Sequence, residues 1–168
     1  MKLILILSIA LSTDLIFQEE DFDLNKIEFQ GLSFFVTKSE VVTKFGNPRI
    51  NEPNYECGFY SNDQPSGPFY QLVYEDFNYI GSDQEKFLLE EVLFDKEGQI
   101  TIKYDEQKLN GLTTKKGFAA IFGSYAKDLI DKYPEEKAFI LFSNESDDGA
   151  RFTFESGKLI KFEYWSPC

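Results

Sequence analysis

In several stretches of the chain, apolar and polar residues alternate one by one, a period typical of β-strands with one buried face. The clearest case lies near the C-terminus, where Phe152, Phe154, Phe162 and Tyr164 alternate along two segments. Aromatic residues of this kind also favour strands over helices. The pattern predicts strands over residues 55–61, 69–75, 86–94, 99–104, 138–143, 151–155 and 158–165.

A helical period replaces this alternation in a few places. The segment 39–45 carries one apolar stripe, and Thr37 with Glu40 has the spacing of a capping box. The Gly-Asn-Pro sequence at 46–48 should end this helix, because Pro cannot continue one. Helices are therefore predicted over residues 39–45, 114–122 and 125–132.

The chain contains an apparent internal repeat. The first two predicted helices end in matching Phe-Gly pairs, at 45–46 and 122–123, and each is followed by strands. Each strand set also contains a glycine turn, at Gly98 and at Gly157, which predicts hairpins at 94–100 and 154–159. The predicted fold class is α+β, with two related units that each pack a short helix or helix pair on an antiparallel sheet.

The length of 168 residues fits one domain, or two very small ones that share a core. The pattern divides the chain into a signal peptide at 1–12, an N-terminal segment at 13–30, a first unit at 31–108 and a second unit at 109–168.

The first twelve residues have the layout of a secretory signal peptide. One lysine precedes a short apolar run, and Ala10 and Ser12 supply the small residues of a cleavage site after Ser12. The run is too short to span a bilayer. We therefore expect export to the periplasm or the extracellular space. The alternative is an N-terminal strand of the mature fold, which the apolar triplet at 15–17 would continue.

The two cysteines, Cys57 and Cys168, are consistent with one disulfide if the protein is exported. Such a bond would tie the C-terminus to the first predicted strand. Free thiols are the alternative, and the distance between the cysteines in sequence excludes a CxxC redox motif.

Charge and composition limit the possible functions. The formal net charge is −12 at pH 7, which repels nucleic acid and anionic membranes and favours a basic protein partner. The same charge would also keep an aromatic-rich protein soluble. The chain has no His, which excludes Ser-His-Asp and Cys-His catalysis and His-ligated zinc. We expect a protein that is not an enzyme and that has no cofactor.

Carboxylates are the remaining candidates for chemistry. Glu90 and Glu91 are neighbours on a predicted strand, so we expect them to point to opposite faces and not to share a site. The segment 144–155 has the acidic spacing of a calcium-binding loop, but Asn144 stands at its first position and both flanks are predicted strands. An Asp-Gly turn explains the same residues, so we expect no metal site.

Aromatic residues crowd the region between two predicted loops, and they are too many for one small core face. Tyr and Trp are favoured at protein-binding hot spots. The candidate interface consists of Tyr55, Phe59, Tyr60, Phe69, Tyr70, Tyr74 and Trp165. The alternative is a cross-strand aromatic ladder that only stabilises the sheet.

Two known families resemble parts of this chain. The helix that ends in Phe45-Gly46-Asn47-Pro48, its start at Ser39-Glu40-Val41 and the hairpin at 94–100 resemble the BamE (SmpA/OmlA) group of outer-membrane-assembly lipoproteins. The tandem arrangement resembles β-lactamase-inhibitor-type proteins. The resemblance covers residues 33–104 and 109–165 and implies two units that form a concave protein-binding face. No Cys follows the apolar N-terminal run, so a lipid anchor is not implied.

These observations together favour an exported, non-catalytic protein-binding module of the inhibitor, immunity or envelope-accessory type. A carboxylate-dependent hydrolase and a small-molecule carrier are the alternatives.

Overall fold

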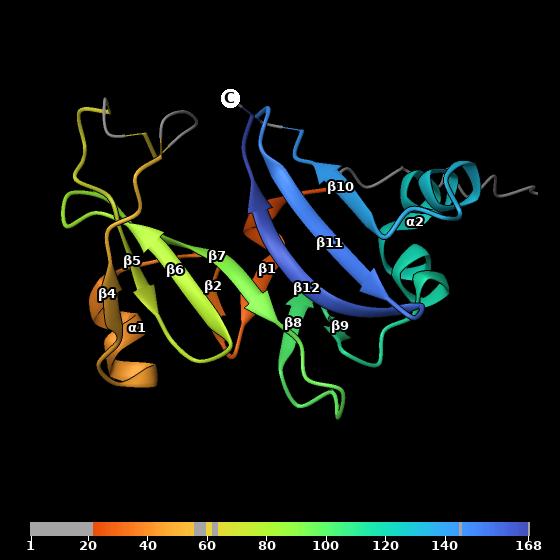
Figure 1. Cartoon of the computed structure of the whole chain (residues 1–168), viewed down its shortest axis with the longest axis horizontal. Helices are drawn as coiled ribbons and strands as arrows, with labels where there is room; N and C mark the ends of the chain where they lie inside the picture. The colour runs from red at the N-terminus through yellow and green to blue at the C-terminus, as the bar shows by residue number, and fades with distance from the viewer. Residues whose placement is uncertain (1–21, 56–59, 62–63, 145, 168) are drawn as a thin grey trace, which may run out of the picture.

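The computed structural model describes residues 22–55, 60–61, 64–144 and 146–167, which form two antiparallel sheets and two α-helices (Figure 1). In chain order, the elements are the 3₁₀ turn η1 (Leu24–Lys26), β1 (Ile27–Phe29), β2 (Leu32–Ser33), β3 (Phe35–Val36), α1 (Lys38–Phe45), β4 (Arg49–Asn51), β5 (Tyr70–Val73), β6 (Phe77–Gly81), β7 (Phe87–Leu93), β8 (Thr101–Tyr104), β9 (Gln107–Asn110), α2 (Lys115–Lys132), β10 (Ala138–Phe142), β11 (Gly149–Glu155) and β12 (Lys158–Trp165).

The large sheet has eight strands. Seven follow the order β10-β11-β12-β7-β6-β5-β4, and β3 pairs with the first part of β7. The small sheet has the order β2-β1-β8-β9. All pairings are antiparallel, so β10 and β4 are the two edge strands of the large sheet.

The predicted α+β class with two helix-and-sheet units is wrong, because the chain is predominantly antiparallel β-sheet. β7 and β12, which were assigned to different units, pair with each other and place Val92 opposite Phe162. One sheet therefore runs through both expected units. β1 pairs with β8 in the same way, and the expected boundary at 108/109 falls inside β9. Alternation predicts that a segment is a strand, but the choice of partner strand depends on the fit of the whole core.

The predicted hairpin at 94–100 is also wrong, because β7 belongs to the large sheet and β8 to the small one. The connection turns from one sheet to the other around the carboxylate of Asp95, which accepts the backbone amides of Gln99 at 3.0 Å and Ile100 at 2.6 Å. The turn at 156–157 does join paired strands, β11 and β12, as predicted.

The helices begin and end close to where the sequence predicted. α1 is capped by Thr37, and the reciprocal hydrogen bonds between Thr37 and Glu40 confirm the capping box. α2 is interrupted at Gly123, where φ is 73° and the backbone is not helical. Gly46 after α1 has a similar φ of 82°. The glycine of each Phe-Gly pair thus has a backbone conformation that disfavours a Cβ atom. This similarity of the two helix ends is consistent with the proposed repeat. The repeat as a whole stays a prediction.

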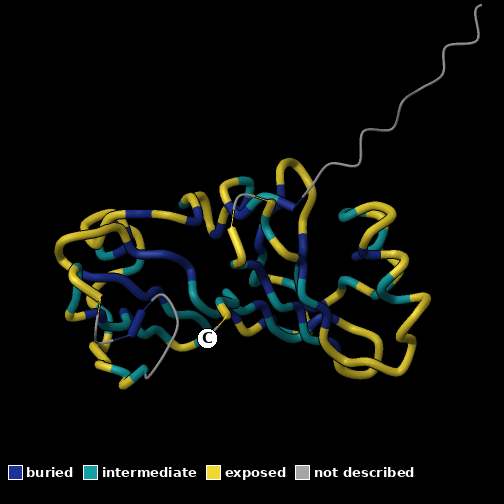
Figure 2. The backbone as a smooth tube through the Cα atoms, turned by 90° about the horizontal axis from the view of Figure 1, so that it is seen from above, coloured by how far each residue is buried: buried dark blue, intermediate teal, exposed yellow. Residues whose placement is uncertain are grey.

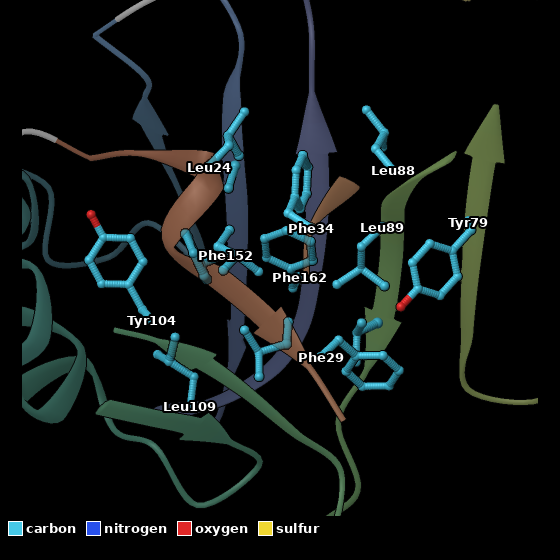
Figure 3. Close-up of a cluster of buried hydrophobic side chains, with 14 of the residues drawn as sticks. Leu24, Phe29, Phe34, Tyr79, Leu88, Leu89, Tyr104, Leu109, Phe152 and Phe162 are labelled. Atoms are coloured by element: carbon cyan, nitrogen blue, oxygen red, sulfur yellow. The ribbon is translucent and has the colours of Figure 1, made fainter. Parts of the chain in front are cut away.

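Core residues form one row across the large sheet. Phe77, Val92, Phe162 and Phe152 are successive cross-strand partners, so their side chains share a face. The interior around this row, drawn in Figure 3, is rich in aromatic rings. Its large rings contact one another edge to face or tilted, an arrangement that stabilises beyond area burial.

Both helices and the small sheet pack on this one face. Phe45 of α1 and Phe29 of β1 contact Phe77, with ring centroids 4.7 and 4.8 Å apart, and Phe118 of α2 contacts Phe152 at 4.9 Å. Figure 2 shows buried segments that run through the interior and exposed segments mostly at the periphery. We call this side of the large sheet the covered face and the other side the open face.

Candidate protein-binding surface

The open face presents a row of mostly polar side chains over the middle of the sheet. Ile140, Arg151, Glu163, Glu91 and Asn78 are successive cross-strand partners on β10, β11, β12, β7 and β6. They lie one position away from the core row, so they point to the opposite face. All five are partly exposed. This part of the sheet is therefore accessible to a partner molecule.

Three charged side chains of the open face form an ion-pair cluster. Lys161 donates to the carboxylate of Glu91 at 3.0 Å and to that of Glu163 at 2.8 Å. Burial lowers the pKa of Lys161, but the two carboxylates outweigh this effect and hold its pKa above the ordinary value. The cluster leaves one excess negative charge, and its partial exposure limits its effect on stability.

An aromatic pair lies at the end of this face. Phe142 and Trp165 flank Gly149 in the neighbouring cross-strand row, and their rings meet at 90° with centroids 5.2 Å apart. Phe142 is 46% exposed, and Trp165 is partly exposed. The rings cover the glycine between them, which has no side chain of its own to pack. Aromatic side chains that are held in place but accessible are typical of protein-binding hot spots.

The loops at the same end of the sheet are acidic. Because the strands are antiparallel, the connections 52–69, 82–86 and 143–148 all emerge where β10, β12, β6 and β4 end. Lys86 is the single basic residue in these three stretches of sequence. The described acidic residues there are Glu52, Asp83, Glu85, Asp147 and Asp148. We call this region, together with Phe142 and Trp165, the acidic end.

Glu90 anchors the long connection between β4 and β5. Its carboxylate accepts a hydrogen bond from the hydroxyl of Tyr55 and one from the amide of Gln71 at 2.6 Å. Burial raises the pKa of Glu90 above its usual range, although the two hydrogen bonds oppose the shift. Burial likewise raises the pKa of Tyr55. Tyr55 thereby fixes the start of the connection to β7.

The expectation that Glu90 and Glu91 point to opposite faces is wrong. The register between β6 and β7 shifts between Asn78 and Tyr79, so that Glu90 is an extra residue in β7. Such a bulge interrupts strict alternation. Glu90 bonds Gln71 on the open face, which Glu91 shares, and the charge of Glu91 contributes to the raised pKa of Glu90.

The predicted interface residues divide into three groups. Tyr60 and Phe69 are buried and contact each other at 5.2 Å, so they pack inside the protein. Tyr70 and Tyr74 are partly exposed. The Tyr70 hydroxyl bonds Lys38 and Asp83, and the Tyr74 hydroxyl donates to the carbonyl of Gly46 at 2.8 Å. Tyr55 and Trp165 lie on the open face, as set out above, and Phe59 lies outside the described residues.

Sequence reasoning missed Phe142, which lies in the apolar run 138–142 and gives no sign of exposure there. Its exposure follows from the position of β10 at the edge of the sheet. No local signal marks this position, because the place of a strand at an edge depends on the order of all the strands in the sheet.

The remaining predicted features are the disulfide, the signal peptide and the calcium-loop spacing. Cys57, Cys168 and the predicted signal peptide fall outside the described residues. Within them, no group of acidic or sulfur ligands could hold a metal ion, and no helix has the length and hydrophobicity needed to cross a membrane. The calcium-loop spacing at 144–155 includes all of β11, which is extended and cannot wrap around a cation.

Comparison of the chain with protein-family models, curated proteins and solved structures finds no significant match in any of the three.

Proposed function

We propose that this chain is an exported, non-catalytic binding protein that captures a basic protein partner at its acidic end. The observation that carries the proposal is the position of the Phe142–Trp165 pair beside loops in which acidic residues far outnumber basic ones. Aromatic rings supply contact area at low conformational cost, and the surrounding carboxylates attract positive charge. The net charge of −12 acts in the same direction.

A carboxylate-dependent hydrolase has less support from the geometry. Both oxygens of Glu90 are occupied, one by Tyr55 and one by Gln71. Glu91 and Glu163 share Lys161, which neutralises part of their charge. A general acid and a nucleophile or base would need free carboxyl groups that face a common substrate position.

The proposal is tested with a defined basic probe, a capped octapeptide of alternating Lys and Val. Trp165 is the single tryptophan of the chain, so its fluorescence reports binding at the acidic end directly. We expect saturable binding that weakens as salt is added, because salt screens exposed charges.

Charge reversal locates the binding surface. The double variant Asp147→Lys, Glu85→Lys should weaken binding about tenfold, since each exposed ion pair contributes roughly 0.2–1 kcal/mol and reversal also adds repulsion. The matched control, Glu106→Lys with Asp128→Lys, reverses two exposed charges on the β8–β9 turn and on α2. Equal losses in both double variants, or no binding at low salt, would rule out the acidic end as the site.

Export is tested by the intact mass of the protein secreted from a bacterial host, with and without reductant before alkylation. We expect a chain that starts at Thr13, with Cys57 and Cys168 protected from alkylation until they are reduced. A mass that starts at Met1 with two reactive thiols would contradict export.

A further inference from the structure

The edge strands of the two sheets differ in how well they are protected against pairing with another chain. Proteins usually blunt sheet edges with short strands, charged residues or Pro. β2 and β3 have two residues each, β4 has three and is flanked by Pro48 and Pro53, and β9 carries the exposed Lys108. β10 has five residues, Ala138–Phe142, with no charge and no Pro. It is the outermost strand on its side of the large sheet (Figure 1).

The unpaired backbone groups of β10 can be assigned from its register. The amide of Phe154 bonds the carbonyl of Lys137, and the amide of Ser143 bonds the carbonyl of Asp148, so the odd positions of β10 face β11. In an antiparallel pair, the alternate residues direct their N–H and C=O groups away from the partner. Ala138, Ile140 and Phe142 therefore point theirs outward, and no described residue hydrogen-bonds to these groups.

Helix α2 approaches β10 without using these outward groups. The ammonium group of Lys115 lies over the ring of Phe139, 5.3 Å from its centroid, and donates to the carbonyls of Pro134 and Glu136. Phe139 is opposite Phe152 of the core row, so this contact is on the covered face. The side chains of the outward residues lie on the open face, where Phe142 contacts Trp165.

The charge at the Phe142 end of this edge favours a basic occupant over a second copy of the chain. Asp147 and Asp148 lie in the connection that follows β10, next to Phe142. Two copies that met at this edge would bring together two chains of net charge −12. A basic extended segment would instead pair with the edge while its cations lie near these carboxylates.

From these observations we infer that β10 is the docking edge of the protein, and that the basic partner adds an extended segment to the large sheet as an extra strand beside Ala138–Phe142. Main-chain hydrogen bonds at Ala138, Ile140 and Phe142 provide affinity in this mode, and side-chain contacts with Phe142 and Trp165 provide selectivity. The inference rests on the proposed function and specifies how the partner is held.

The experiment uses the full chain, the Lys-Val octapeptide and amide hydrogen exchange. In the free protein, the amides of Phe139 and Leu141 should exchange slowly and those of Ala138, Ile140 and Phe142 quickly. At saturating peptide, the three outward amides should become protected. A second peptide with Pro in place of two adjacent central residues keeps all but one of the lysines, yet it should bind at least tenfold more weakly because it lacks central donors.

A protein variant gives the matching test. Ile140→Pro removes one outward N–H and no bond to β11, a position where edge strands tolerate Pro. It should weaken octapeptide binding at least tenfold, whereas Ile140→Val should bind as the unmodified chain does. If Ile140→Pro lowers the thermal midpoint, Ala138→Lys replaces it as the test. This variant adds a charge at the edge and should weaken octapeptide binding to a similar extent.

The outcomes separate the two proposals. Binding that depends on Asp147 but leaves the outward amides unprotected, and that Ile140→Pro and Ala138→Lys do not weaken, would overturn strand addition and leave the acidic end as the binding site. Absence of any binding would overturn the proposed function. Sedimentation could instead show a dimer of the free protein in which the outward amides are already protected. If Ala138→Lys dissociates this dimer, a second copy of the chain occupies the edge, and the inference is overturned.

Discussion

The two halves of the large sheet are built alike on the covered face and differently on the open face. In the half formed by β4, β5, β6 and the first part of β7, Ile80 and Leu88 of the open face are 0% and 2% exposed, whereas their neighbours Gln71 and Asn78 are partly exposed. In the half formed by β10, β11 and β12, the open-face residues Ile140, Arg151 and Glu163 are all partly exposed. The first half has the long connection 52–69, which Tyr55 ties to Glu90. The second half has the short connection 143–148.

This difference explains where a partner can bind. A sheet face that its own connection covers contributes to stability, and a face left open is available for recognition. The aromatic residues follow the same division. Tyr60 and Phe69 are buried in the first half, whereas Phe142 and Trp165 are accessible in the second. The two edge strands of the large sheet follow the same division, since Pro residues flank β4 and none lies in β10.

The largest expected effect comes from truncating an open-face isoleucine in each half of the large sheet and comparing the two losses of stability. Ile80→Ala should lower the free energy of unfolding by about 2–5 kcal/mol, because it leaves a cavity at a fully buried site. Ile140→Ala, the matched control on the other half, should cost about 1 kcal/mol or less, since its site is already partly hydrated. Urea unfolding followed by circular dichroism measures both. Similar losses in the two variants would show that the open face is not divided as described.

The next effect concerns the anchor of the long connection. Because burial raises the pKa of Glu90 in the folded state, the folded protein binds more protons than the unfolded chain above the ordinary Glu pKa of 4.5. Its contribution to stability is therefore fully present below pH 4.5 and is lost as the pH rises through the folded pKa. Glu90→Gln should remove this decline from the dependence of the unfolding free energy on pH.

The control for Glu90→Gln is Glu106→Gln, at an exposed turn outside the large sheet, which should keep the decline seen in the unmodified chain. Unfolding free energies from urea titrations between pH 4 and 8 give the comparison. A profile of Glu90→Gln that runs parallel to that of the unmodified chain would mean that Glu90 is not desolvated by the connection.

The sequence predicted much of the strand pattern but little of how strands associate. Alternating Phe residues located β11 and β12, and the capping box located α1, because these signals are local. The strand β4 was missed, since its three residues are all exposed and show no alternation. The pairing of β7 with β12 could not be predicted, because it depends on how Phe77, Val92, Phe162 and Phe152 fit together in three dimensions.

The candidate site was predictable to a smaller extent. The single Trp165 stood out by its type, and it does lie on the open face. Tyr60 and Phe69 look the same in sequence as exposed aromatic residues, and their burial follows from the packing of the connection. The bulge that brings Glu90 and Glu91 to one face has no signal in an otherwise regular strand. Exposure of β10 at an edge likewise depends on the order of strands.

The smallest expected effect concerns two tyrosines that distinguish the first half from the second. The core face of β11 uses Phe152 and Phe154, whereas β6 places Tyr79 there, fully buried, with no hydrogen-bond partner for its hydroxyl among the described residues. Tyr79→Phe should leave the unfolding free energy unchanged or raise it by up to about 1 kcal/mol, because an unsatisfied buried hydroxyl is removed. Tyr74→Phe should lower it by roughly 0.5–1.5 kcal/mol, because Tyr74 donates to Gly46. Urea unfolding distinguishes the expected gain or absence of change in Tyr79→Phe from the expected loss in Tyr74→Phe. A clear loss of unfolding free energy in Tyr79→Phe would indicate that its hydroxyl has a partner in solution, such as a buried water. The first half would then have a polar core contact that the phenylalanines of the second half cannot make.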